Sequence, residues 1–466
     1  MKIKELIDTD LEIEVGGISY DSRNTKKDDV FIAISGYSSD GHSFASVAEK
    51  NGAVCVVCER EIPGLSIPMI MVDDTRAALA KMSHAFFGNP SEKLCLIGVT
   101  GTNGKTTVTY LLKTILEAFG GKVGLIGTNQ NMIGERVIDS KNTTPESFEL
   151  AKLFRQMIDE GCTHAVMEVS SHSLEMHRVD GCDFDVGIFT NLTQDHLDFH
   201  KTMENYKNAK IKLFKRCKCG IINADDAYGA DIEKEAECKI VTYGIKNGEI
   251  KAESIKTGVE GVEFVCRGAK IRLGIPGHFS VYNALAAISA SLCLNIGIDV
   301  IAKAMSLANG VKGRAELVPT GRNFSVIIDY AHTPDGLRNI LESVREFTSG
   351  RLVVLFGCGG DRDKTKRPIM GKIAGELADY CIISSDNPRS EEPAAIIRDI
   401  LAGMKVATAE YIVVENRRDA IEFAITHAKD GDVIVLAGKG HETYQILADK
   451  TIHFDEREII EEVLGR

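Results

Sequence analysis

The segment from Gly98 to Thr107, which reads GVTGTNGKTT, constrains the fold of this chain more than any other. It follows an apolar run over 94–99 and precedes a run whose apolar residues recur at helical spacing: Val108, Leu111, Leu112, Ile115, Leu116 and Phe119. A strand, a glycine loop ending in Lys-Thr and a helix together form a cradle for nucleotide phosphates, because backbone N–H groups and the lysine meet the anionic oxygens. Val99 stands where the strict pattern GxxxxGK[ST] has its first glycine, and Gly98 and Gly101 flank it. The segment therefore predicts an ATP site in an α/β fold.

Length and composition narrow the class of protein. The 466 residues are too many for one ordinary core and predict about three domains. The net charge of −12 argues against a nucleic-acid partner, which would need clustered Lys and Arg. The amino terminus has no apolar signal core, and no window approaches about 18 uninterrupted apolar residues, so we expect a cytoplasmic protein with no membrane partner. The 12 cysteines include one CxxC, at 55–58, and no second one to pair with it, which favours reduced thiols.

Two segments divide the chain. Residues 87–91 (FGNPS) and 309–313 (NGVKG) have the composition of joints and predict domains over 1–90, 91–313 and 314–466. Apolar strands alternate with helical patterns in all three blocks, with strands expected over 30–34, 54–58, 69–72, 94–99, 164–169, 186–190, 221–224, 325–330, 352–356, 381–384, 412–415 and 433–437. Strands that are apolar on both faces predict parallel sheets covered on both sides. We expect an α/β protein with a central P-loop ATPase domain on a mostly parallel sheet, a Rossmann-like C-terminal domain and a smaller mixed α/β N-terminal domain.

Polar residues follow the strands of the middle block, where ligands of such sheets collect. Glu168 ends one strand beside the P-loop and is placed to bind Mg²⁺, because the phosphates of ATP must be neutralised before attack. The loop over 190–198 contributes Asp and His side chains to the same edge. Lys210 falls in a basic helical stretch, which on its own is more typical of a solvated helix face. A buried lysine can instead react with CO₂ to give a carbamate that binds metals, and the residues alone do not decide between the two.

Three glycine or polar loops follow strands of the last block and predict a recognition pocket. They are GCGGDRD over 357–363, SDNPRSE over 385–391 and GKGHE over 438–442. Arg389 has the planar fork that binds a carboxylate, and we expect it to be buried. Asp386 and Glu391 have the charge that would receive an ammonium group.

With these motifs the chain resembles the Mur ligases, ATP-dependent amino-acid-adding enzymes of peptidoglycan precursor synthesis. The resemblance covers essentially the whole chain and rests on TGTNGKTT at 100–107, EVSSH at 168–172, TNLTQDHLDFH at 190–200, DYAHTPD at 329–335, GCGGDRDKTKRP at 357–368, DNPRSEEP at 386–393 and AGKGHE at 437–442. Within the family it is most similar to the branch that adds meso-2,6-diaminopimelate to a UDP-N-acetylmuramoyl dipeptide. That resemblance implies an acyl-phosphate intermediate, ATP and Mg²⁺ as cofactors, and a monomer.

The resemblance also implies a role for individual residues. The catalytic set is Lys105, Glu168, His196 and Lys210, and the metal ligands are Thr106, Glu168, His196 and Lys210 as a carbamate. ATP contacts are Gly101, Thr102, Asn103, Gly104, Lys105, Thr106, Thr107, Asn283, Arg314 and Asp329. The UDP substrate is expected at Ser22, Asn142, Thr143, Thr144, Ser170 and Arg178, with the loop over 36–41 close by. The incoming amino acid is expected at Arg362, Asp386, Asn387, Pro388, Arg389, Gly438 and Glu442.

One departure and three alternatives bear on this interpretation. Met176 stands where the family often has a substrate-binding Gln, so we leave it out of the expected site. A lysine-adding Mur ligase is the nearest alternative, although its pocket has no need for Arg389. A ligase resembling folylpolyglutamate synthetase shares the central ATPase but needs no uridine-binding first domain. A nucleotide-binding regulator without ligase activity has no need for Glu168, His196 and Lys210 beside the P-loop.

Overall fold

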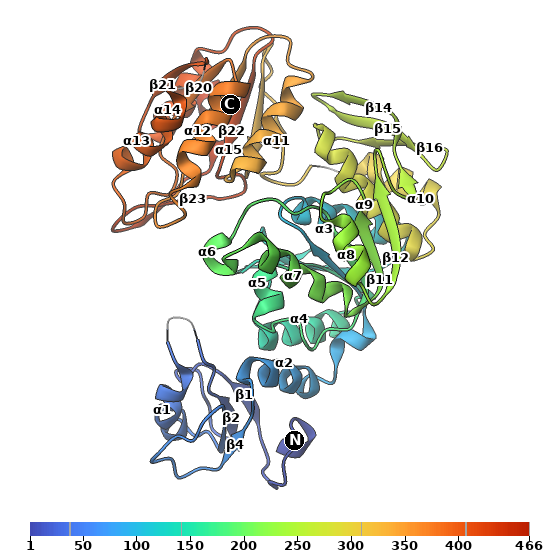
Figure 1. Ribbon diagram of the computed structural model, residues 1–466, viewed down its shortest axis with the longest axis vertical. Helices are drawn as coiled ribbons and strands as arrows, with labels where there is room; N and C mark the ends of the chain where they lie inside the picture. The colour runs from blue at the N-terminus through green and yellow to red at the C-terminus, as the bar shows by residue number, and fades with distance from the viewer. Residues whose placement is uncertain (37–38, 141, 309, 406–407, 466) are drawn as a thin grey trace.

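The computed structural model describes residues 1–36, 39–140, 142–308, 310–405 and 408–465. Three α/β bodies follow one another along the long axis of the molecule, and the two termini lie at opposite ends (Figure 1). None of the helices in the described ranges combines the length and apolar content needed to cross a membrane. Of the segments named from the sequence, Tyr37 and Ser38 of the first loop and Asn309 of the second joint lie outside the described residues.

The first body is a four-stranded parallel sheet with the order β1-β2-β3-β4. Its apolar residues form small cores on both faces of the sheet, between the strands and two helices. Asp74 begins the second helix by accepting hydrogen bonds from the Arg76 and Ala77 N–H groups, as an N-cap does. The elements are β1 Gly17–Ser19, β2 Asp29–Ile32, α1 Ala45–Lys50, β3 Cys55–Cys58, β4 Met69–Met71 and α2 Thr75–Phe86.

The central body is built on a nine-stranded sheet with the order β13-β12-β11-β10-β5-β9-β6-β7-β8. All neighbouring pairs are parallel except β6 with β7 and β7 with β8. The strands are β5 Cys95–Thr100, β6 Val123–Ile126, β7 Asn131–Ile133, β8 Arg136–Ile138, β9 His164–Glu168, β10 Phe184–Phe189, β11 Cys217–Asn223, β12 Lys239–Gly244 and β13 Ile250–Lys251. A separate antiparallel sheet comprises β14 Glu253–Gly258, β15 Gly261–Cys266 and β16 Ala269–Leu273.

Helices cover both faces of this sheet, as the apolar strands predict. One core contains residues of α3 and α9, and a second contains residues of α4 and α7. The helices are α3 Lys105–Ala118, α4 Ser147–Asp159, α5 Ser171–Glu175, α6 Leu197–His200, α7 Met203–Phe214, α8 Gly229–Glu235, α9 His278–Cys293 and α10 Ile298–Leu307. The prediction that Phe119 shares the apolar face of α3 is wrong. The helix ends at Ala118, so Phe119 lies past its last turn and is 52% exposed.

The third body has a six-stranded sheet with the order β17-β18-β22-β19-β20-β21, parallel except for β17 with β18. Its elements are β17 Glu316–Val318, β18 Ser325–Asp329, α11 Pro334–Arg345, β19 Leu352–Phe356, α12 Lys366–Leu377, β20 Tyr380–Ile383, α13 Pro393–Met404, β21 Glu410–Val413, α14 Arg417–Thr426, β22 Val433–Ala437, the hairpin β23 Tyr444–Ile446 with β24 Thr451–His453, and α15 Glu456–Leu464. The α/β class expected from the sequence is confirmed, and every expected strand is present, some with shifted ends. The sequence analysis did not predict β1, β6, β12 and β13, nor the antiparallel strands β7, β8, β14 to β17, β23 and β24.

Candidate active site

The P-loop joins β5, the middle strand of the nine-stranded sheet, to α3. Gly101 and Gly104 have φ of +150° and +88°, which L side chains rarely adopt. A Cβ would also collide with the Thr190 hydroxyl at the first position and with the Asn283 amide oxygen at the second. Both glycines are therefore required for the close approach of Thr190 and Asn283 to the loop.

Lys105 is folded back over the P-loop. Its Nζ donates to the carbonyl oxygens of Gly101 and Thr102, each at 2.8 Å. Burial lowers the pKa of Lys105, and the nearby Glu168 carboxylate opposes that shift. Thr106 and Thr107 at the start of α3 are buried. The P-loop thus holds the Lys105 cation beside its own backbone, whose N–H groups can bind an anionic ligand.

Glu168 lies beside the P-loop because β9 pairs with β5, with Glu168 opposite Val99. The side chain is 1% exposed, and its two carboxylate oxygens accept hydrogen bonds from the N–H and the hydroxyl of Thr128, at 2.9 and 3.0 Å. Thr128 also contacts Thr143, with 3.0 Å between the two hydroxyl oxygens. The carboxylate is therefore fixed in place before any ligand arrives.

Two more of the predicted residues, His196 and Lys210, lie close enough to Lys105 for its charge to act on both. Burial lowers the pKa of His196 to about 4, so its imidazole is neutral and able to bind a metal at pH 7. The interpretation of Lys210 as part of a solvated face is wrong, because Lys210 is 1% exposed on α7. Its ammonium lies 4.5 Å from the centre of the Tyr206 ring and makes no hydrogen bond to the described residues. Burial, and then the charge of Lys105, lower the pKa of Lys210 well below its ordinary value.

The third body reaches the P-loop through two side chains. Arg314 Nη2 donates to the Thr106 hydroxyl at 3.2 Å, and its guanidinium lies 4.6 Å from the centre of the Tyr330 ring. Asp335 accepts from the Asn103 amide at 2.8 Å and from the Thr193 hydroxyl at 3.0 Å. Asp329 is near Arg314, accepts from the Ala315 N–H at 2.7 Å, and has a pKa raised by burial. The sequence interpretation included neither Tyr330 nor Asp335, although the DYAHTPD motif contains both.

A cavity of about 710 Å³ lies between the first and central bodies. Ser22 and Arg178 line it, together with Gly36, Ser39 and Gly41 of the expected loop. Asn142, Thr143, Thr144 and Ser170 are not among its described lining residues. Thr144 instead uses its hydroxyl in bonds to the Glu168 carbonyl and the Ser170 N–H, at 2.8 and 3.1 Å, and Asn142 is exposed.

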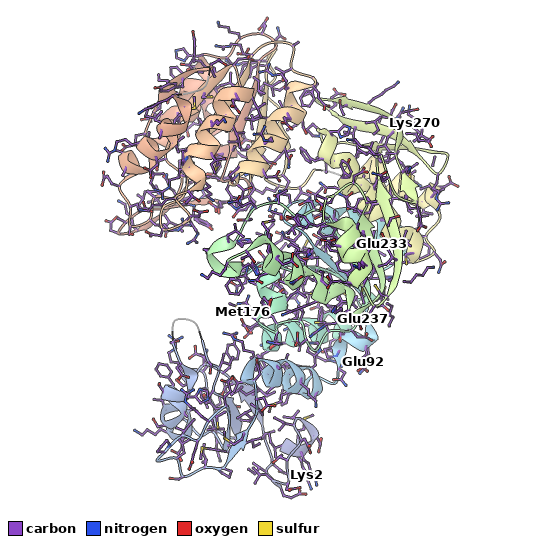
Figure 2. The ribbon with its side chains drawn as sticks, in the orientation of Figure 1. Lys2, Glu92, Met176, Glu233, Glu237 and Lys270 are labelled. Carbon is purple, nitrogen blue, oxygen red and sulfur yellow. The ribbon has the colours of Figure 1, made fainter. Side chains whose placement is uncertain are left out.

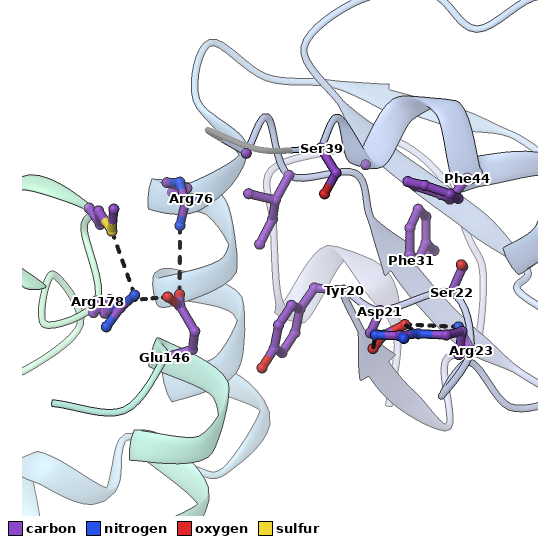
Figure 3. Close-up of a pocket in the computed structure, with 14 residues that line it drawn as sticks. Tyr20, Asp21, Ser22, Arg23, Phe31, Ser39, Phe44, Arg76, Glu146 and Arg178 are labelled. Carbon is purple, nitrogen blue, oxygen red and sulfur yellow. Dashed lines mark hydrogen bonds and ion pairs between the residues drawn. The ribbon is translucent and has the colours of Figure 1, made fainter. Parts of the chain in front are cut away.

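The cavity contains residues that the sequence did not single out. Glu146 pairs with Arg178 at 2.5 Å and with Arg76 at 3.7 Å, and Figure 3 shows both arginines pointing toward that carboxylate. Met176, labelled in Figure 2, lines the cavity as well, and its sulfur accepts a bond from Arg178 at 3.6 Å. Met176, which the sequence analysis left out of the expected site, therefore lies beside Arg178 in the lining of this cavity.

The loops after β19, β20 and β22 meet in the third body, as expected for neighbouring parallel strands. Asp386 and Asn387 are buried, Gly360 N–H donates to the Asn387 carbonyl at 2.9 Å, and Gly438 has φ of +117° with Asp386 against it. Asn387 Nδ2 donates to Glu442 Oε2 at 2.9 Å. These contacts bring the predicted amino-acid-binding loops to one place.

The arginines and acids of these loops differ partly from expectation. Arg389 is half-buried rather than buried, with φ of +53°, and its Nη1 donates to the Gly360 carbonyl at 2.8 Å. Arg362 is exposed and bonds only to the Asp361 carbonyl among the described residues. Glu391 is not available for an ammonium ligand, because it pairs with Arg367 at 2.9 Å and Lys364 at 3.0 Å.

Comparisons with known proteins agree with this geometry. Three family descriptions match in order: "Mur ligase family, catalytic domain" over 14–87, "Mur ligase middle domain" over 99–291 and "Mur ligase, glutamate ligase domain" over 313–440. UDP-N-acetylmuramoyl-L-alanyl-D-glutamate–2,6-diaminopimelate ligase of Caldanaerobacter subterraneus subsp. tengcongensis is 53% identical, over 99% of this chain and 97% of its own. The chain belongs to the Mur ligase family. It is an ATP-dependent ligase that forms amide bonds.

Two further Mur ligases extend the match. The ligase of the same name from Clostridium botulinum is 54% identical, over 97% of this chain and 95% of its own. A solved structure of a protein with that name is 31% identical, with a TM-score of 0.72 over 100% of this chain and 99% of that one. The Mur ligase fold thus extends over all three bodies.

Proposed function

We propose that this ligase adds meso-2,6-diaminopimelate to UDP-N-acetylmuramoyl-L-alanyl-D-glutamate through an acyl-phosphate intermediate. Identity above 50% over nearly the full chain to ligases named for that reaction supports the substrate pair. The observation that carries the choice of amino acid is the convergence of Asp386, Asn387, Arg389 and Glu442 in one group of loops. These side chains offer acidic groups for an ammonium and a guanidinium for a carboxylate, and diaminopimelate has both at its far end.

In this proposal the UDP-linked dipeptide, ATP and the amino acid each bind in a different region of the chain. The proposed domains are those expected from the sequence, 1–90, 91–313 and 314–466. The UDP-linked dipeptide occupies the cavity with Ser22 and Arg178, and its peptide end extends past Thr143, Thr144 and Ser170 toward Glu168. ATP binds at the P-loop, with contacts from Asn283, Arg314 and Asp329. The amino acid approaches from the third domain, where Arg362 and Gly438 border the pocket. One chain supplies every contact, so we also propose that a monomer suffices.

The chemistry follows from the charges at the P-loop. The γ-phosphoryl group of ATP is transferred to the D-glutamate γ-carboxylate, and the amine of diaminopimelate then attacks the acyl phosphate and expels phosphate. Both steps build negative charge close to Lys105, whose cation is held over the loop by backbone carbonyls. Arg314 brings a second cation to Thr106 from the third domain.

The residues present fit a Mg²⁺ ion that enters with ATP. No group of three or more His, Cys, Asp or Glu side chains in the described ranges could hold a metal by itself. Mg²⁺ commonly keeps several waters and is held by one or two carboxylates plus substrate phosphates, so a preformed cage is not needed. Glu168, Thr106 and His196 would hold it. The ion would neutralise the phosphate oxygens during transfer.

Lys210 is proposed to act as a carbamate. A lysine buried at 1% exposure, with a lowered pKa and no hydrogen bond to the described residues, favours the neutral amine that adds to CO₂. The carbamate would supply the carboxylate oxygens that the predicted metal site otherwise lacks. Because a carbamate is negatively charged, residue 210 would then attract Lys105 instead of repelling it.

The substitution Arg389→Ala tests the amino-acid pocket. Removing one partner of a desolvated ion pair costs 2–5 kcal/mol or more, and the half-buried position of Arg389 points to the lower end, about 2–3 kcal/mol. We expect kcat/KM for diaminopimelate to fall by about 100-fold while the KM values for ATP and the UDP substrate stay within twofold. The matched control is Arg398→Ala, which removes an exposed arginine of the same domain. An unchanged preference for diaminopimelate over lysine in Arg389→Ala would refute this assignment.

A further inference from the structure

A fully buried lysine lies behind the proposed amino-acid pocket. Lys439 lies two residues after the end of β22, and its side chain has no exposed surface. Lysine is almost never buried completely unless its charge is paired. Here Nζ donates to Glu442 Oε2 at 2.9 Å and to Asn387 Oδ1 at 3.2 Å. Both partners belong to the pocket, whereas Lys439 itself is covered by the Tyr444 and Phe454 rings, whose centres each lie 5.7 Å from Nζ.

The contacts of Lys439 are part of a closed hydrogen-bond network. Asn387 Nδ2 donates to the same Glu442 Oε2 at 2.9 Å, and its Oδ1 also accepts from the Ile446 N–H at 3.0 Å. Two donors on Oδ1 and one acceptor for Nδ2 fix which way the amide faces. Gln445 completes the support with a 2.6 Å bond to the Asp386 carbonyl. The network thus fixes the orientation of two side chains of the pocket, Asn387 and Glu442.

Glu442 has one oxygen occupied and one available. Oε2 takes both donors of the network, while Oε1 has no hydrogen-bond partner among the described residues. The side chain is only 12% exposed, so the free oxygen sits on a carboxylate that is largely shielded from water. Glu442 Oε1 therefore offers an ammonium ligand one hydrogen-bond acceptor with a fixed direction. The buried Lys439 ammonium offsets the negative charge of Glu442. That charge therefore repels Asp386, or a carboxylate of the amino-acid ligand, less strongly.

We propose that Lys439 is a positioning residue for amino-acid selection, which acts through Glu442 and Asn387 without touching the substrate. This inference rests on the proposed function of the pocket. Lys439 locks the Asn387 amide and directs the free Glu442 oxygen. It also balances the negative charge of the pocket, so that a zwitterionic amino acid with an added ammonium and carboxylate is accepted.

The test compares Lys439→Met with wild-type enzyme in the ligation reaction, with the KM for each of the three substrates measured separately. We expect the KM for meso-diaminopimelate to rise at least tenfold, with the KM values for ATP and the UDP-dipeptide within twofold. Lys450→Met is the matched control, since Lys450 is exposed in the turn of the neighbouring hairpin, and it should leave all three values unchanged. In a Glu442→Gln background, Lys439→Met should raise the KM for diaminopimelate by a smaller factor than it does in the wild-type background, because the ion pair is already absent and only the bond to Asn387 is lost.

The possible outcomes separate this role from the function on which it rests. A wild-type enzyme that ligates no diaminopimelate would overturn both. Wild-type turnover with an unchanged KM for diaminopimelate in Lys439→Met would overturn the role of Lys439 alone. Thermal unfolding of Lys439→Met and of the second variant, Lys439→Gln, monitors the fold. Equal rises in all three KM values, additive effects in the Glu442→Gln background, or failure of both variants to fold would show a purely structural lysine and overturn the proposal.

Discussion

Replacement of Asp335 by alanine should loosen the third domain from the P-loop. Asp335 lies in the first turn of α11 and accepts two hydrogen bonds from the central domain, from Asn103 at 2.8 Å and Thr193 at 3.0 Å. Hydrogen bonds to charged groups contribute about 1.5 kcal/mol each at the low end of the usual range. Losing both amounts to about 3 kcal/mol, which shifts the equilibrium between docked and undocked domains by about 100-fold.

Two measurements follow this change. Small-angle scattering should give a larger radius of gyration for Asp335→Ala than for wild-type enzyme, and kcat/KM for ATP should fall, because Arg314 reaches Thr106 only from the docked domain. Asn339→Ala is the matched control, since it removes the 3.0 Å bond to Asp335 within α11 and leaves both interdomain bonds intact. Identical scattering curves and kcat/KM values within twofold for Asp335→Ala and wild type would refute the reasoning.

Three further results are expected. Lys105→Ala should abolish ligation while calorimetric binding of the UDP substrate largely survives, because the cavity and the P-loop lie apart; a parallel loss of that binding would contradict it. Lys210→Ala should lose most activity and regain part of it with acetate, whose carboxylate replaces the carbamate; full activity without acetate would remove Lys210 from the mechanism. Hydrogen bonds from Arg367 lower the pKa of Glu391 to about 2, so this pair stabilises the fold above pH 4.5 and the stabilisation is lost as pH falls from 4.5 toward 2. Melting temperatures of Glu391→Gln should depend less on pH over that range than those of wild type.

The sequence predicts those parts of the site that are local in the chain. The P-loop is contiguous, and Glu168 ends a strand of the same sheet, at the edge where ligands of parallel sheets bind, so both could be placed from the sequence pattern. Burial of Lys210 could not be read from a helix rich in lysine, because it depends on which face of α7 turns inward.

Residues whose partners are distant in sequence escaped prediction. Asp335 bonds to Asn103, 232 positions earlier, and Lys439 bonds to Asn387, 52 positions earlier. Glu391 has the charge expected of an ammonium ligand, yet Arg367 of α12 occupies it. Nothing in the local sequence distinguishes an acid that binds a ligand from one that pairs with a neighbouring helix.

A ligation assay with a panel of amino acids tests the proposed reaction most directly. Wild-type enzyme would be supplied with MgATP, UDP-N-acetylmuramoyl-L-alanyl-D-glutamate and one amino acid at a time, with phosphate release and the product mass followed together. We expect meso-diaminopimelate to give one phosphate for each new amide bond, and lysine to be used at least 100-fold less efficiently, since it leaves Arg389 without its carboxylate. Equal use of lysine, or phosphate release without a new amide bond, would contradict the proposal.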